Sequence, residues 1–394
     1  MENSKYILTQ RLSLLLTFSV GVIAANLYYA QPLTAQISHA LGLEPTVAGL
    51  VVTLTQIGYG LGVLFLVPLG DLVENRKLIL SLIGLAILAL LVVSTSTQTI
   101  TYFASALVLG IGVSSVQMIV PYAAHLSPVE KRGQVVGKLM SGLMMGIMLS
   151  RPIAGLLTDL ISWHAVFYLS AVMMLIIMVC LYLYLPKRQP SHSNIHYYSL
   201  LKSMGHLFLK YSILRRRAIY QAFMFAAFCL FWTATPLLLA GPDFHLSQSQ
   251  IAIFALVGVG GAILAPIAGK MADRGLTRTA SRLSMIAGAL AFAITHLAPA
   301  GSTASLILLT LAAILLDGGV SSNLVLGQRE IFELPAEFRG RLNSIYIAII
   351  FIGGAFGSFI GVWAYSHGQW NMTSAVGFLL PFICLLYFTT DKNK

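Results

Sequence analysis

The sequence predicts an all-α membrane protein whose twelve transmembrane helices form two pseudo-symmetric six-helix bundles. Three observations lead to this fold class. The 394 residues are 57% hydrophobic and only 9% charged, whereas a soluble domain carries roughly 25% charged residues. Basic residues fall on alternate connections between apolar runs, and the two halves of the chain repeat one another at a fixed offset.

Twelve apolar runs are long enough to cross a hydrocarbon core of roughly 30 Å as helices. Lys5 and Arg11 precede the first run as in a signal peptide, but the run reaches Pro32 without a clear small-residue cleavage site. We therefore interpret it as the first span. The expected spans are residues 12–33, 46–69, 78–96, 100–123, 137–161, 164–186, 217–240, 249–270, 281–299, 303–326, 341–365 and 371–390.

The basic side chains indicate the orientation of these spans. All of the 24 lysines and arginines except Arg151 lie at the chain ends, in every second loop, or at the edges of those loops. Because positively charged loops stay on the cytoplasmic side, we expect this set of loops and both termini to be cytoplasmic. The net charge of +11 is then explained by membrane topology, and we expect no nucleic-acid partner.

The chain divides into two halves of similar length. Residues 1–186 would form an N-terminal bundle and residues 217–394 a C-terminal bundle. The linker 187–216 carries apolar residues at helical spacing, which predicts an amphipathic helix on the cytoplasmic face. We expect that helix to act as a tether between the bundles.

Short motifs in the first half recur in the second. Gly-Val-Ser-Ser at 112–115 recurs at 319–322, and Pro-x-Glu-x-Arg-Gly at 128–133 recurs at 335–340. Both pairs share an offset of 207, from 319 minus 112 and from 335 minus 128. Motifs at one offset in equivalent spans predict a duplication, with the repeat axis along the membrane normal.

Four stretches carry a resemblance to a known family. Residues 69–77 read Leu-Gly-Asp-Leu-Val-Glu-Asn-Arg-Lys after the second span, and residues 269–275 read Gly-Lys-Met-Ala-Asp-Arg-Gly after the eighth. Span five contains Arg-Pro-Ile-Ala-Gly at 151–155, and span one contains Asn-Leu-Tyr-Tyr-Ala-Gln-Pro at 26–32. The chain resembles the major facilitator superfamily, and within it the bacterial drug and metabolite exporters of the twelve-helix proton-antiporter type.

The resemblance implies a secondary transporter that moves a small molecule by alternating access, with protons as the coupling ion. It implies that a monomer works in the inner membrane of a bacterium. It also implies gating roles for residues after the second and eighth spans and within the fifth span. The gating candidates are Asp71, Arg76, Asp273, Arg274, Pro152 and Gly155.

The chain departs from the family pattern after span two and, at two positions that bear on coupling, in spans four and five. Val67 and Glu74 stand where the motif after span two has glycines, and Ala106 stands at about the position of the arginine of proton-coupled exporters. Arg151 replaces a glycine in span five. The standard coupling scheme of the family therefore does not transfer directly to this chain.

Arg151 lies about 3 Å from the middle of span 137–161 at 1.5 Å per residue, too deep for its side chain to reach the membrane surface. An uncompensated arginine at that depth costs at least ~2.5–3.5 kcal/mol. Its best counter-charge is Asp317, the one acidic residue near the middle of an expected span. Burial favours a protonated carboxyl and a nearby arginine favours the ionised form. This competition suits a proton-coupling site.

Three other interpretations remain open. Arg151 and Asp317 could be a permanent structural pair. Arg151 could instead hold an organic anion such as a carboxylate, a phosphate ester or a siderophore. A receptor or scaffold without transport would need no matched charges in a cavity.

The resemblance further implies that spans 1, 4, 7 and 10 line a central cavity. Any single polar residue there could equally make a hydrogen bond between packed helices. The candidate substrate-binding residues are Asn26, Tyr28, Gln31, Gln56, Tyr59, Gln117, Gln221, Trp232 and Asn323.

Small residues repeat every four positions in two spans and predict close helix packing. Examples are Gly142 and Gly146 in span five and Gly353, Gly357 and Gly361 in span eleven. The sequence has no phosphate-binding glycine loop and no His-Glu-x-x-His motif, and its three cysteines lie far apart in apolar runs. We therefore expect no enzyme, cofactor or metal site.

Overall fold

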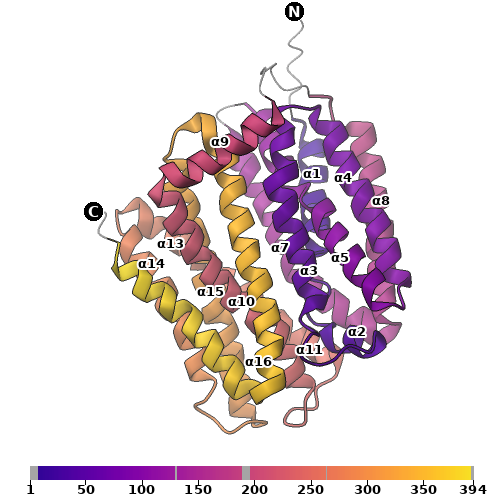
Figure 1. The fold of residues 1–394 in the computed structure, drawn as a ribbon, viewed down its shortest axis with the longest axis vertical. Helices are drawn as coiled ribbons and strands as arrows, with labels where there is room; N and C mark the ends of the chain where they lie inside the picture. The colour runs from indigo at the N-terminus through magenta and orange to yellow at the C-terminus, as the bar shows by residue number, and fades with distance from the viewer. Residues whose placement is uncertain (1–7, 129–130, 189–195, 263, 392–394) are drawn as a thin grey trace, which may run out of the picture.

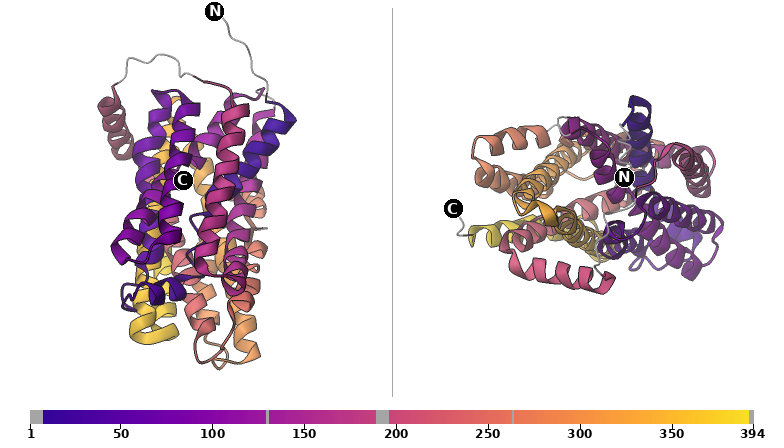
Figure 2. Two further views of the ribbon diagram at one scale, coloured as in Figure 1. Left: turned by 90° about the vertical axis from the view of Figure 1, so that its right-hand side faces the viewer. Right: turned by 90° about the horizontal axis from the view of Figure 1, so that it is seen from above.

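The computed structural model describes residues 8–128, 131–188, 196–262 and 264–391. These residues form helices joined by short connections, without a strand, which confirms the all-α class. Two helical bundles stand side by side, one built from the first half of the chain and one from the second (Figure 1). The view along the bundles shows the same division (Figure 2).

The N-terminal bundle contains helices broken at three places. The first span of the prediction bends after α1, the second passes through a π-helical turn (η1) and a 3-10 turn (η2), and the fourth breaks between α5 and α6 at Ser114 and Ser115. The elements are α1 (Gln10–Ala25), α2 (Thr34–Ala40), α3 (Leu50–Leu61), η1 (Gly62–Leu66), η2 (Val67–Asp71), α4 (Asn75–Thr95), α5 (Thr99–Val113), α6 (Val116–His125), α7 (Arg132–Leu160) and α8 (Trp163–Tyr184).

The linker helix and the C-terminal bundle follow. In α9, Leu200, Met204 and Leu207 are buried at helical spacing. Residues 189–195 of the linker lie outside the described residues. The elements are α9 (Tyr197–Lys210), α10 (Ser212–Ala240), α11 (Gln248–Ala255), α12 (Gly258–Ala262), α13 (Leu264–Asp273), α14 (Thr277–Ile294), α15 (Thr303–Phe332), η4 (Ala336–Phe338) and α16 (Arg339–Thr389).

Eight helical segments of the described residues are long and apolar enough to cross a membrane. The longest, α16, has non-helical backbone at Gly368 and Gln369, between the expected spans 341–365 and 371–390. The expected spans 249–270 and 281–299 fall on α11 to α13 and on α14. The prediction of a membrane protein with helical spans is therefore confirmed, and the number of twelve spans stays a prediction.

Glycines allow the closest helix contacts within each bundle. A side chain at Gly21 of α1 would meet the carbonyl oxygen of Gly142 of α7 at 2.6 Å. In the other bundle, a side chain at Gly361 of α16 would meet the Cα atom of Leu230 of α10 at 3.0 Å. Backbones can approach this closely only where one residue has no side chain. The tight packing predicted for spans five and eleven is confirmed.

The two bundles meet along α3 with α16 and along α7 with α11. We call the end at which α4, α7 and α10 begin the basic end, because the arginines of the loops gather there, and the other the opposite end. Leu8 donates to the Leu126 carbonyl and Asp391 lies 3.9 Å from Arg216. The first and last described residues therefore both lie at the basic end.

Candidate functional site

A cavity of about 1470 Å³ lies between the two bundles. It reaches from Arg151 and Asp317, in the middle of α7 and α15, to Asp71, Arg188 and Arg341 at the basic end. Drug-sized ligands occupy pockets of roughly 300–1,000 Å³, so the space accommodates a small organic molecule. Its apolar walls include a row of methionines and two phenylalanines, namely Met118, Met140, Met144, Met145, Met148, Phe225 and Phe228.

Arg151 forms the deep end of this cavity and is only 3% exposed. Its Nε donates to Gln31 Oε1 at 3.0 Å, and its Cζ lies 4.3 Å from the ring centre of Trp232, 5.2 Å from Phe228 and 5.5 Å from Tyr28. Aromatic faces stabilise a desolvated cation by ~2 kcal/mol or more. They therefore replace a direct counter-ion as the main support of the guanidinium.

One buried nitrogen of this guanidinium donates no hydrogen bond to any described residue. Arg151 Nη2 is buried and has no hydrogen-bond partner among the described residues. Leaving a buried donor of a charged group unpaired costs roughly 1–3 kcal/mol or more. The structure therefore holds an arginine that is oriented by Gln31 and still has bonding capacity.

Asp317 lies on α15 at the same depth and is 7% exposed. Its Oδ1 accepts a hydrogen bond of 2.8 Å from Trp232 Nε1. Asp317 and Arg151 interact electrostatically but form no ion pair in the described part of the chain. The pairing expected from the sequence is therefore indirect, because the Trp232 indole touches both groups.

Four of the nine candidate substrate-binding residues line the cavity, namely Tyr28, Tyr59, Gln117 and Gln221. Three of them form hydrogen bonds: Gln117 Nε2 donates to Tyr59 Oη at 2.9 Å, and Gln221 Nε2 donates to the Val320 carbonyl at 3.1 Å. These two groups come from different bundles. They add polar contacts to a cavity that is otherwise largely apolar.

The other five candidates lie outside the lining, namely Asn26, Gln31, Gln56, Trp232 and Asn323. Each is engaged with protein: Asn26 Oδ1 accepts from Ser170 Oγ at 2.6 Å, and Asn323 Nδ2 donates to Gln221 Oε1 at 2.7 Å. Gln56 Nε2 donates across the bundles to Cys229 Sγ at 3.3 Å. For Asn26 and Gln56, the alternative of a packing hydrogen bond agrees better with these contacts.

The arrangement of two bundles around a central cavity agrees with the comparisons of this chain with known proteins. The model of the family described as Major Facilitator Superfamily matches residues 14–331 and, in a second match, residues 218–394. The chain belongs to the major facilitator superfamily. The recognition made from the sequence motifs is confirmed, and the chain is a secondary transporter that acts on a small molecule in a lipid bilayer.

Individual members of the superfamily are similar over nearly the whole chain. The uncharacterized transporter YgaY of Escherichia coli O157:H7 is 36% identical over 386 residues, which are 98% of this chain and 97% of that protein. The solved nucleoside transporter NupG aligns with a TM-score of 0.77 at 13% identity and covers 96% of this chain and 100% of its own. A D-xylose-proton symporter aligns with a TM-score of 0.71 at 14% identity, covering 94% and 96%.

At the opposite end, the two halves of this major facilitator fold are in contact. A side chain at Gly155 of α7 would meet Ala252 Cβ of α11 at 2.8 Å. One turn further, Asp159 Oδ2 accepts from the backbone N and the Oγ of Ser249, at 2.6 and 2.5 Å. On the other seam, Thr53 Oγ1 donates to the Ala355 carbonyl at 3.1 Å. The cavity is closed here and open toward the basic end.

Asp159 is not among the site residues predicted from the sequence. In the structure it is exposed, yet it bonds a free N–H in the first turn of α11. The first N–H groups of any helix lack partners within that helix. The sequence offered one signal for this contact. It is a carboxylate at the end of an apolar span in one half and a serine-rich helix start in the other half.

The predicted gating residues at the basic end have different surroundings. Asp71 Oδ2 lies 3.9 Å from Arg341 Nε, across the two halves. Asp273 bonds Arg329 at 2.5 Å within its own half. Arg76 bonds the Tyr182 carbonyl of its own half.

The remaining two are Arg274, whose side chain is exposed, and Pro152, which is buried next to Arg151 in α7. Arg274 forms no ion pair among the residues described.

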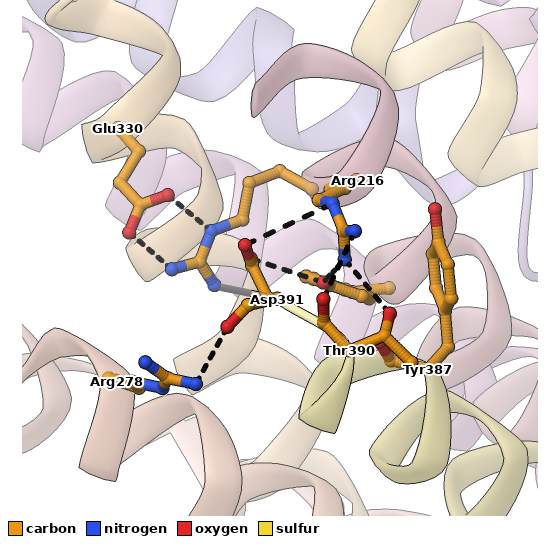
Figure 3. A network of polar contacts seen from close by, with 8 residues as sticks. Arg216, Arg278, Glu330, Tyr387, Thr390 and Asp391 are labelled. Carbon is orange, nitrogen blue, oxygen red and sulfur yellow. Dashed lines mark hydrogen bonds and ion pairs between the residues drawn. The ribbon is translucent and has the colours of Figure 1, made fainter. Parts of the chain in front are cut away.

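A network of arginines ties the C-terminal bundle together at the basic end (Figure 3). Buried Arg217 on α10 forms a bidentate pair with Glu330 on α15 and donates to Ser281 Oγ of α14 at 2.7 Å. Arg278 Nη2 donates to the Asp391 carbonyl at 2.7 Å. These arginines, expected to serve topology alone, also join four helices of one half.

Proposed function

We propose that this transporter couples proton movement to the export of small organic compounds, with Asp317 as the proton carrier and Arg151 as its electrostatic partner. The observation that supports this most directly is a buried carboxyl at the deep end of the cavity, opposite an arginine of the other bundle. Ionisable groups in membrane-spanning helices are rare and mark proton pathways in pumps and transporters.

The coupling follows from where the two groups are attached. Asp317 belongs to the C-terminal bundle and Arg151 to the N-terminal bundle. Rocking of the bundles changes the distance between them, and their interaction in a low dielectric depends steeply on distance. In one state Arg151 favours the carboxylate; in the other the carboxyl holds its proton. A cationic or neutral compound that docks near Asp317 then exchanges with the proton.

The direction follows from the expected orientation. Positively charged loops favour a cytoplasmic position for the basic end and both termini, and in this proposal the chain works as a monomer in the inner membrane of a bacterium. The cavity then faces the cytoplasm, where an exporter collects its substrate. The contact of Asp71 with Arg341 at that end would separate and reform as the bundles rock. So would the contacts at the opposite end, of Gly155 with Ala252 and of Asp159 with Ser249.

The test is transport into inside-out vesicles under an imposed pH gradient. Asp317→Asn keeps the shape of the side chain and cannot change its charge, so we expect gradient-driven uptake of a lipophilic cation such as tetraphenylphosphonium to be lost. Asp243→Asn, an exposed acid at the opposite end, is the matched control and should retain it. Full gradient-driven uptake with Asp317→Asn would refute the assignment.

A second candidate function rests on Arg151 Nη2, which is buried and without a partner. A carboxylate or phosphate bound there would complete the arginine, and methionine and phenylalanine side chains would contact its apolar body. The chain would then be an organic-anion carrier. Arg151→Lys should lose affinity nearly as strongly as Arg151→Ala, because an ammonium cannot replace a bidentate guanidinium.

The two candidates predict opposite pH dependence of binding. A cation competes with the proton for Asp317, so its binding should weaken as pH falls. An anion is attracted more strongly once Asp317 is neutral, so its binding should strengthen as pH falls. Thermal-shift titrations with tetraphenylphosphonium and with 1-naphthoate at several pH values decide between them.

A further inference from the structure

Trp232 is the one residue of the described chain whose side chain is recorded in contact with both intramembrane charges. Its Nε1 donates to Asp317 Oδ1 at 2.8 Å, and the centre of its ring lies 4.3 Å from Arg151 Cζ. It is 2% exposed and lies outside the cavity lining. Trp232 therefore lies between Arg151 and Asp317, outside the wall of the cavity.

The surrounding residues hold the indole in one orientation. Phe231 packs edge-on at 5.5 Å between ring centres, and Phe254 of α11 packs at 6.0 Å. A side chain at Gly258 of α12 would meet Trp232 Cζ2 at 3.0 Å and Asp317 Oδ2 at 2.5 Å. The absence of a Cβ atom at Gly258 thus lets α12 cover the bond between the indole and the carboxylate.

Few titratable groups surround this bond. Arg151 of α7 and Tyr28, which follows α1, interact electrostatically with Asp317, and Cys229 of α10 faces Tyr28 and Arg151. α12 reads Gly-Val-Gly-Gly-Ala and so carries no titratable side chain, and its Gly258 and Gly261 lie next to Asp317. Among the residues described, Arg151 is therefore the charged group that a change in the protonation of Asp317 affects most directly.

We propose that Trp232 is the positioning residue that makes the placement of Arg151 depend on the protonation of Asp317. This inference rests on the proposed function, in which Asp317 carries the proton. A hydrogen bond to a carboxylate is about twice as strong as one to a neutral acceptor. Protonation of Asp317 weakens its hydrogen bond with the Trp232 indole. The indole then shifts relative to the Arg151 guanidinium and changes the position from which Arg151 contacts the substrate.

Trp232→Phe tests this directly, because phenylalanine keeps an aromatic face for Arg151 and lacks the N–H. A hydrogen bond to a charged group contributes ~1.5–3 kcal/mol, and one pH unit corresponds to ~1.4 kcal/mol. Without the donor the carboxylate is less favoured, so the midpoint of the pH profile of uptake should move to higher pH by about one unit or more. The maximal rate of uptake, measured at the optimal pH, should stay close to that of the unmodified protein.

The matched control is Trp370→Phe, which also removes an indole N–H bond, to Thr295 Oγ1 at 3.0 Å. Its midpoint should not move. An unmoved midpoint in Trp232→Phe, together with loss of gradient-driven uptake in Asp317→Asn, would overturn the role of Trp232 and leave the proton carrier standing. Retained gradient-driven uptake in Asp317→Asn would instead overturn the proposed function.

A second measurement covers the case in which Trp232→Phe does not fold. With Trp163, Trp363 and Trp370 replaced by phenylalanine, Trp232 is the sole tryptophan of the chain. Its fluorescence should titrate with the same midpoint as uptake and lose that titration in Asp317→Asn. Fluorescence that does not change with pH would also overturn the proposal.

Discussion

The contact between Asp159 and Ser249 should set how often the opposite end opens. Asp159→Ala removes two hydrogen bonds that join α7 to α11 across the halves. A capping interaction contributes ~0.5–2 kcal/mol, and the exposure of Asp159 places the value toward the lower part of that range. A loss of ~1 kcal/mol should raise the population that is open at this end about fivefold.

Cys229 provides a natural reporter of this opening. It is fully buried at the seam between the bundles, where its Sγ accepts from Gln56 Nε2. With Cys180 and Cys384 replaced by alanine, a membrane-impermeant maleimide added to intact cells should alkylate it about five times faster in Asp159→Ala, following the population estimate above. Glu44→Ala, an exposed acid at the same end, should leave the rate unchanged. Equal rates in the two variants would refute the reasoning.

Two further predictions concern stability in detergent. Glu330→Ala leaves the buried Arg217 without its carboxylate and should cost ~3 kcal/mol, whereas Asp273→Ala breaks an exposed pair and should cost under ~1 kcal/mol; equal falls in melting temperature would contradict the contrast. Gly146→Ala puts a Cβ atom onto the backbone of Gly21 and should sharply reduce folded yield, while Gly137→Ala, with open space around it, should raise stability by ~0.5–1 kcal/mol; a normal yield for Gly146→Ala would contradict the packing.

Most of the fold could be predicted from the sequence, because a few simple properties determine where the helices of a membrane protein lie. Apolar length, basic loops and small residues every four positions are local properties, and each has a direct physical cause. The prominence of Arg151 and Asp317 was also predictable, since charges are so costly in the membrane that few are present. The residues that sequence reasoning singled out first are those whose character is unusual for their position.

The sequence does not carry the contacts that depend on how helices are rotated and staggered. Trp232 was expected to line the cavity, but the rotation of α10 against α15 turns its indole toward Asp317 instead. Asp159 resembled any loop charge until the start of α11 was placed beside it. Asn26 and Gln56 are polar residues in the correct spans that face neighbouring helices. Periodicity alone cannot decide these orientations.

Arg151 and Asp317 break the symmetry that the rest of the fold keeps. The duplication gives the bundles equivalent spans, yet the position offset by 207 from Arg151 is Ser358 and the one offset from Asp317 is Gly110. The cation therefore belongs to one rocking body, and the carboxyl with its indole donor belongs to the other. Any motion that closes the basic end and opens the opposite end must change the contact between Arg151 and Trp232. In the proposed mechanism, conformation and the proton affinity of Asp317 are coupled because the two charges are attached to different bundles.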